Sequence, residues 1–142
     1  MTGVLGSRLV PVLVAAACLG GCAKPCHGIT PSNDAKRLGI VLDGGRLCKE
    51  GRSVADIDYP DTSASALSGK YKSTLDKAGW KADATSSGGV IFATRASDTL
   101  FIVTGKKSKQ RHVPFAVVRY CTQDSCRQML SALFGAMKKQ SK

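Results

Sequence analysis

The feature that most constrains this 142-residue chain is an apolar run near its N-terminus that ends in small residues and a cysteine. The run covers residues 9–19, follows the basic residue Arg8 and leads into Gly20, Gly21 and Cys22. A membrane-spanning helix needs about 20 apolar residues, so this run is too short to cross a bilayer. Its length and flanks are typical of an export signal, which is removed from the mature protein. We therefore expect the fold to form downstream of this segment and outside the cytoplasm.

The stretch Leu19-Gly20-Gly21-Cys22 resembles the signal of bacterial lipoproteins, in which an aliphatic residue and two small residues precede the cysteine that is lipidated. The resemblance implies that residues 1–21 are cleaved and that Cys22 becomes a lipid-bearing N-terminus in the bacterial cell envelope. Because Ala23 follows Cys22 where an aspartate would resemble an inner-membrane retention signal, the outer membrane is favoured over the plasma membrane. Two or more acyl chains, at about 0.8 kcal/mol per buried CH₂, make such an anchor stable.

Three other interpretations of the N-terminus remain open. Residues 15–18 form a second signal of this kind, weaker because it lacks the aliphatic residue. Ordinary secretory cleavage after Ala17 would release the protein without an anchor, and an uncleaved segment would stay attached. With cleavage before Cys22, we expect a lipidated N-terminus and flexible tether over residues 22–37, rich in loop-forming residues, and one small domain over residues 38–142.

Four cysteines remain if Cys18 is cleaved off and Cys22 is lipidated: Cys26, Cys48, Cys121 and Cys126. An even number in an exported chain predicts disulfides rather than free thiols or a metal site. We favour a Cys121–Cys126 bridge because a strand end and a helix start bring Cα atoms within the about 4.4–6.8 Å that a bridge requires. Cys26 then pairs with Cys48. The pairing of each N-terminal cysteine with a C-terminal one remains an alternative.

The remaining sequence predicts an α+β domain. Residues 53–59 alternate between apolar and acidic residues, as in a strand with one face in water. Apolar residues recur every three or four positions over residues 64–78, before Gly79 and Trp80, and again from Cys126 to Met137 in a helix over residues 123–138. We expect a mostly antiparallel sheet of four to five strands with two helices packed on one face (β-α-β-β-β-β-α). The other expected strands are residues 81–85, 90–95, 99–104 and 113–121, with a short strand over 38–42.

Residues suited to catalysis are scarce. The chain has two histidines and no nucleophile elbow, paired-histidine motif or phosphate-binding glycine loop. We therefore expect a non-enzymatic protein without a cofactor or a metal. The alternative is an exported enzyme or redox accessory that uses the carboxylates of Asp56 and Asp58 or the Cys121/Cys126 pair. Four residues separate these two cysteines, whereas reactive redox pairs are normally spaced Cys-x-x-Cys.

The charge of the chain points to an anionic partner. Lysine and arginine number 21 against 10 acidic residues, for a net charge of +11. Four of the basic residues crowd one loop: Lys106, Lys107, Lys109 and Arg111. This loop lacks the interleaved aromatic residues on which bases stack, so we do not expect nucleic acid. We predict a binding or structural domain, held at a membrane by Cys22, whose partner is an anionic lipid, an envelope polymer or an envelope protein.

Overall fold

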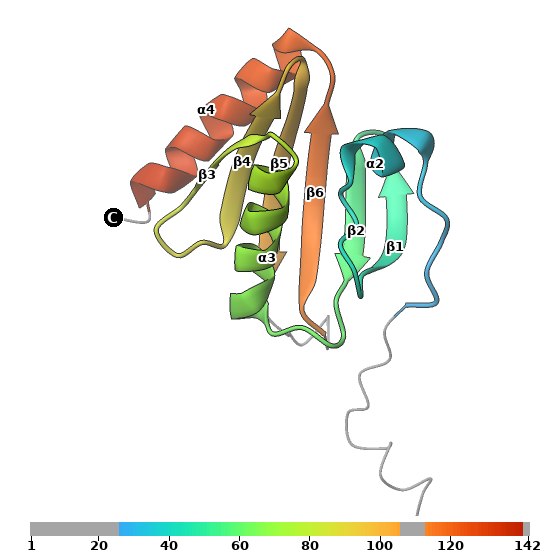
Figure 1. Ribbon diagram of the computed structural model, residues 1–142. Coiled ribbons are helices and arrows are strands. Elements are labelled where there is room, and N and C mark those ends of the chain that lie inside the picture. The colour runs from blue at the N-terminus through green and yellow to red at the C-terminus, as the bar shows by residue number, and fades with distance from the viewer. Residues whose placement is uncertain (1–25, 106–112, 141–142) are drawn as a thin grey trace, which may run out of the picture.

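A six-stranded antiparallel sheet forms the centre of the domain (Figure 1). The computed structural model describes residues 26–105 and 113–140. The neighbouring strands follow the order β1-β2-β6-β5-β4-β3. The elements are α2 (Asn33–Leu38), β1 (Arg46–Gly51), β2 (Val54–Asp58), α3 (Ala64–Lys77), β3 (Lys81–Ala84), β4 (Val90–Arg95), β5 (Asp98–Gly105), β6 (Phe115–Cys121) and α4 (Asp124–Gln140). This confirms the predicted α+β class, with more strands than the four to five expected.

The two long helices pack on opposite faces of the sheet, so the prediction that they share one face is wrong. Leu67 of α3 belongs to a core with Ile102 of β5, whereas Leu130 and Phe134 of α4 belong to a second core with Phe101. Successive residues of a strand point to opposite faces, which places Phe101 and Ile102 on different sides. The continuous apolar runs at residues 90–93 and 100–103 are typical of strands that are buried on both faces. We call the face under α3 the near face and the face under α4 the far face (Figure 1).

Helix α4 covers only part of the far face. It packs mainly on β4 and β5, and the ring of Phe134 stacks on Phe92 with centroids 5.6 Å apart. The apolar stripe predicted from Cys126 to Met137 is wider than the surface that it buries, because Met129 and Leu133 are 62% and 45% exposed. No helix within the described residues combines the length and hydrophobicity needed to cross a membrane.

Helix α3 begins and ends at the residues that the sequence predicts. The Ser63 hydroxyl accepts a hydrogen bond from the Ala66 N–H (3.2 Å) and caps the first turn. At the other end Gly79 adopts φ 83°, a left-handed conformation that favours glycine. The Trp80 N–H then donates to the Leu75 carbonyl (3.0 Å), which completes a Schellman motif and buries the indole ring.

The segment predicted as a tether, residues 22–37, belongs to the domain from Cys26 onward, and residues 22–25 lie outside the described part. Ser32 caps the start of α2, because its hydroxyl accepts a hydrogen bond from the Ala35 N–H (3.2 Å), and Gly39 with φ 65° caps the end. Ala35 and Leu38 are buried. The prediction of a strand over residues 38–42 is also wrong, because Leu38 closes this helix and the left-handed Gly39 turns the chain away from it.

Two tyrosines fix the stretch that follows α2. The Leu42 N–H donates to the Tyr59 hydroxyl (3.1 Å), and the Tyr71 hydroxyl donates to the Ile40 carbonyl (2.8 Å). The hydroxyls of Tyr59 and Tyr71 are 2.5 Å apart. Since Tyr71 has already used its proton, Tyr59 donates to Tyr71. Burial raises the pKa of both tyrosines, so they stay neutral donors in this chain of hydrogen bonds.

Strand β1 (Arg46–Gly51) lies outside the predicted strands. Leu47 is its one buried residue, so its sequence lacks the alternation that marks β2. Its pairing with β2 shifts register between Leu47 and Lys49, around the disulfide-bonded Cys48. The strand therefore depends on pairing with β2 rather than on its own hydrophobic pattern.

We predict that Leu130→Ala lowers the free energy of unfolding by about 2–5 kcal/mol, because it leaves a cavity between α4 and the far face. The matched control on the same helix is Leu133→Ala, at an exposed position, with an expected effect within about 0.5 kcal/mol. Urea unfolding followed by circular dichroism measures both. Equal losses in the two variants would contradict the assigned face of α4.

Candidate functional site

The four cysteines of the domain form two disulfides. Cys26 bonds to Cys48 with Cα atoms 5.5 Å apart, and Cys121 bonds to Cys126 with Cα atoms 6.2 Å apart. This is the pairing that the sequence analysis favours. The Sγ atoms of Cys26 and Cys48 also lie within 4.8 Å of a carboxylate oxygen of Asp58. Sulfur in a disulfide is not the thiolate that binds a metal, so this cluster is a brace rather than a metal site.

The start of the described chain and the two strand ends that flank the basic loop lie at the same end of the sheet. The Cys26 N–H donates to Asp58 Oδ2 (3.4 Å) at the end of β2. Along the same row of the sheet Arg46 pairs with Asp58, Asp58 with Phe115, and Phe115 with Gly105. We call this the Cys26 end of the sheet; it is the lower end in Figure 1. At the opposite end, the Tyr120 N–H donates a hydrogen bond to the Ser53 carbonyl; we call this the Ser53 end.

Several predicted site residues lie outside the described part of the chain. These are the lipidation residue Cys22 and the basic residues Lys106, Lys107, Lys109 and Arg111. The residues that flank the basic loop are described. Gly105 ends β5 and Phe115 begins β6, and the two are paired at the Cys26 end.

Asp56 and Asp58 share the far face of β2, as the alternation in the sequence predicts. Both side chains are half-buried. Their cross-strand partners on β1 are cations, Lys49 opposite Asp56 and Arg46 opposite Asp58. Opposite charges at facing positions stabilise an antiparallel pair. The geometry therefore gives these carboxylates a role in strand pairing and in binding the Cys26 backbone.

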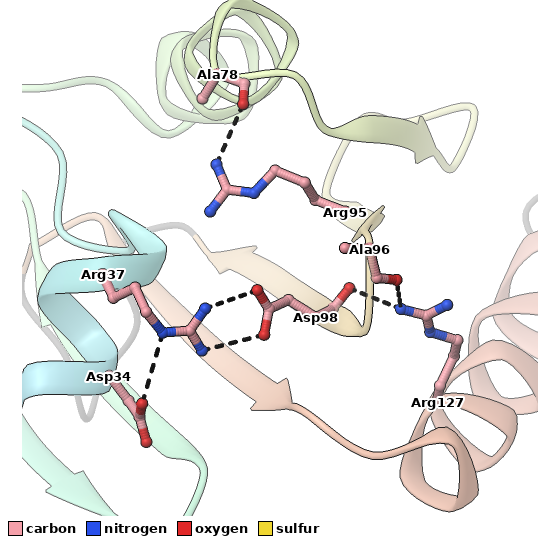
Figure 2. A network of polar contacts seen from close by, with 7 residues as sticks. All are labelled: Asp34, Arg37, Ala78, Arg95, Ala96, Asp98 and Arg127. Atoms are coloured by element: carbon pink, nitrogen blue, oxygen red, sulfur yellow. Dashed lines mark hydrogen bonds and ion pairs between the residues drawn. The ribbon is translucent and has the colours of Figure 1, made fainter.

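A network of three arginines surrounds Asp98 at the turn between β4 and β5 (Figure 2). The guanidinium of Arg37 donates to both carboxylate oxygens of Asp98, at 2.7 and 3.1 Å. Arg127 of α4 donates to the Asp98 carbonyl (3.1 Å) and to the hydroxyl of Thr99 (2.8 Å). Arg95 extends away from the carboxylate and lies 4.4 Å above the Trp80 ring. The arginines therefore bring α2, α4 and the end of α3 to one turn of the sheet.

This network is a brace and not a reaction site. The Asp98 side chain is 12% exposed, and both of its oxygens accept hydrogen bonds from Arg37. The hydrogen bond from Arg37 holds the pKa of Asp98 below its usual value, so the carboxylate stays ionised at neutral pH. No local pattern in the sequence points to this network, because Arg37 and Asp98 are 61 positions apart.

A hollow beside α3 has no cluster of reactive groups among the described residues that line it. It measures about 670 Å³ and lies between the exposed side of α3 and residues 39–43. Its lining combines small or apolar residues with a few hydroxyls and two charges, from Asp43 and Lys70. The hydroxyls of Tyr59 and Tyr71 are bound to each other and to backbone groups, so they do not serve the hollow.

No family model matches this chain, and comparison with characterised proteins and with solved structures finds no significant similarity.

We predict that Asp98→Asn lowers the free energy of unfolding at pH 7 by about 1.5–3 kcal/mol, because it removes a partly buried, charge-assisted pair of hydrogen bonds. The pKa of Asp98 is lowered on folding, so its ionised form stabilises the fold above the unfolded value of about 3.9. That contribution is lost as the pH falls through the lower, folded pKa. The difference between the wild type and Asp98→Asn should therefore shrink in acid, which urea unfolding between pH 2 and 7 measures.

The control is Asp83→Asn, which removes a 2.7 Å pair with Lys138 in which the carboxylate is 57% exposed. We expect a loss below about 1 kcal/mol, because water screens such a pair. If Asp83→Asn cost as much as Asp98→Asn, the arginine network would not be the stronger brace.

Proposed function

We propose that this chain is a bacterial envelope lipoprotein, held at a membrane by lipid on Cys22, whose domain binds an anionic envelope surface and catalyses no reaction. The observation that carries the proposal is the spacing of two cysteines. Leu19-Gly20-Gly21-Cys22 provides the lipidation signal. Four positions later, Cys26 is bonded to Cys48 in the body of the domain.

This spacing makes the anchor short. Three residues separate Cys22 from Cys26, and four extended steps of the chain span at most about 14 Å. The disulfide prevents the segment after Cys26 from lengthening the tether. A lipid on Cys22 therefore keeps the Cys26 end of the sheet against the membrane surface.

The basic loop supports the same orientation. Residues 106–112 carry Lys106, Lys107, Lys109 and Arg111, and the strands that flank them end at the Cys26 end. A basic residue close to an acidic bilayer contributes about 1 kcal/mol to binding, and the attraction decays over a Debye length of about 8 Å. The short anchor keeps the strand ends that flank the loop on the side of the domain that faces the membrane. The loop then assists the lipid and selects anionic headgroups.

We predict that the mature wild-type protein carries acyl mass on Cys22 and that Cys22→Ser abolishes it. Cys18→Ser is the matched control, because Cys18 belongs to the competing signal and its loss should leave the acylation unchanged. Mass spectrometry of the N-terminal peptide measures both. An unmodified Cys22 in the wild type, or acylation that requires Cys18, would contradict the proposed anchor.

We also predict that replacing Lys106, Lys107, Lys109 and Arg111 with alanine weakens binding of the oxidised, unlipidated chain (residues 23–142) to vesicles rich in phosphatidylglycerol. At about 1 kcal/mol per residue, the loss should exceed about a hundredfold at low salt. Vesicle co-sedimentation measures it.

The control variant removes the same charge from α3 and β3, at the exposed residues Lys70, Lys72, Lys77 and Lys81. It should bind almost as tightly as the wild type. An equal loss in both variants would show that total charge, and not the loop at the Cys26 end, determines membrane binding.

A further inference from the structure

The far face of the sheet leaves an apolar strip uncovered next to α4. Val54 of β2 and Val117 of β6 are partly exposed on this face. Met129 and Leu133, one helical turn apart, are 62% and 45% exposed on α4. Of these residues, Val54 and Met129 line one hollow. Exposed apolar side chains that cluster mark interaction sites, and methionine adapts readily to a bound partner.

A hollow of about 130 Å³ lies where the first half of α4 passes β2 and β6. Its apolar lining comes from Val54, Met129, Leu130 and the Cys121–Cys126 disulfide. An apolar cavity of about 150 Å³ holds one benzene molecule. The hollow therefore has room for one apolar side chain, and a long acyl chain would not fit inside it.

Two arginines line the same hollow. Arg119 stands opposite Val54 in the strand register, and Arg52 lies in the turn that leads into β2. Both side chains are exposed, and neither has an acidic partner within residues 26–105 and 113–140. The acidic residues of β1, β2 and α4, which are Glu50, Asp56, Asp58 and Asp124, are not among the lining residues. Two such guanidiniums complement a carboxylate, which they bind through charge-assisted hydrogen bonds.

We propose that this hollow binds the C-terminal residue of a partner polypeptide. Its apolar side chain enters between Val54, Met129 and Leu130, and its terminal carboxylate meets Arg52 and Arg119. A C-terminal residue carries the carboxylate and the side chain on one Cα, which suits a hollow with room for a single side chain. The uncovered strip toward Val117 provides a surface for the residues that precede it.

The hollow lies at the Ser53 end of the sheet. From Val54 to Asp58, β2 spans about 13 Å toward the Cys26 end. A partner would therefore approach from the side away from the membrane. This direction of approach rests on the proposed function, whereas the binding of a C-terminal residue does not.

The experiment measures fluorescence polarisation of dye-labelled decapeptide pools with random internal positions and leucine or phenylalanine as the last residue. The purified, oxidised mature protein is titrated against one pool with a free carboxylate and one with a C-terminal amide. We expect the free-acid pool to bind and amidation to weaken binding at least about tenfold, because it removes the charge that the arginines bind. A free-acid pool that ends in serine should also bind more weakly.

The double variant Arg52→Gln with Arg119→Gln should lose a similar factor for the free-acid pool. Arg46→Gln with Lys49→Gln is the matched control, because it removes the same charge elsewhere on the far face and should leave binding within about twofold of the wild type. The comparison of the acid and amide pools uses only the wild-type protein, so it does not depend on whether the variants fold.

Any of three results with the wild-type protein would overturn the proposal: equal binding of the acid and amide pools, no binding of the acid pool at millimolar protein, or tighter binding of decanoate than of the peptides. Equal losses in the two double variants would also overturn it, since they would show a general attraction of anions. A chain that lacks lipid on Cys22 but binds the free-acid pool would refute the proposed anchor and leave this site intact.

Discussion

The pair between Arg37 and Asp98 fixes the position of α2 against the sheet. It joins α2, at the beginning of the described chain, to the first residue of β5, 61 positions later. A guanidinium that meets a carboxylate through two parallel hydrogen bonds sets both distance and orientation. Arg127 bonds to the backbone of the same turn from α4. Elements from both faces of the sheet are thereby fixed at one corner.

The segment before β1 is held at two further points, which explains why it is ordered with the domain. The Cys26–Cys48 disulfide attaches the start of this segment to β1. The hydrogen-bonded pair of Tyr59 and Tyr71 holds residues 40–42. Each attachment joins positions that are distant in the sequence, so together they limit the conformations available to a stretch with few buried residues. The domain therefore includes Cys26, and the proposed lipid anchor is correspondingly short.

The sheet has two different ends, and the two proposals assign them different partners. At the Cys26 end, the chain enters beside the strands that flank the basic loop. At the Ser53 end, α4 leaves β2 and β6 uncovered around a small apolar hollow with two arginines. The two proposals thus place the membrane and the partner polypeptide at opposite ends of a closely packed sheet.

Local chemistry in the sequence was enough to predict most of the elements and the disulfide framework. The alternation over residues 53–59, the caps at Ser63 and Gly79, and the even number of cysteines act over a few residues, so they are visible without a fold. The caps of α2 at Ser32 and Gly39 are equally local, but the loop-forming residues around them favoured a tether. The proposed lipidation signal is a linear motif and depends on no tertiary contact.

Only the tertiary structure decided which face each helix covers, that β1 joins the sheet, and that arginines from α2 and α4 meet at Asp98. The helix faces and the arginine network depend on residues 29 or more positions apart, and β1 depends on its pairing with β2. A hydrophobic pattern records that a residue is buried but not against what. The exposed Met129 and Leu133 show the same limit: they belong to the apolar stripe of α4 in the sequence, and only the width of the sheet beneath the helix determines that they stay exposed. Arg52 and Arg119 acquire a shared hollow because an antiparallel register places the turn before β2 next to the end of β6.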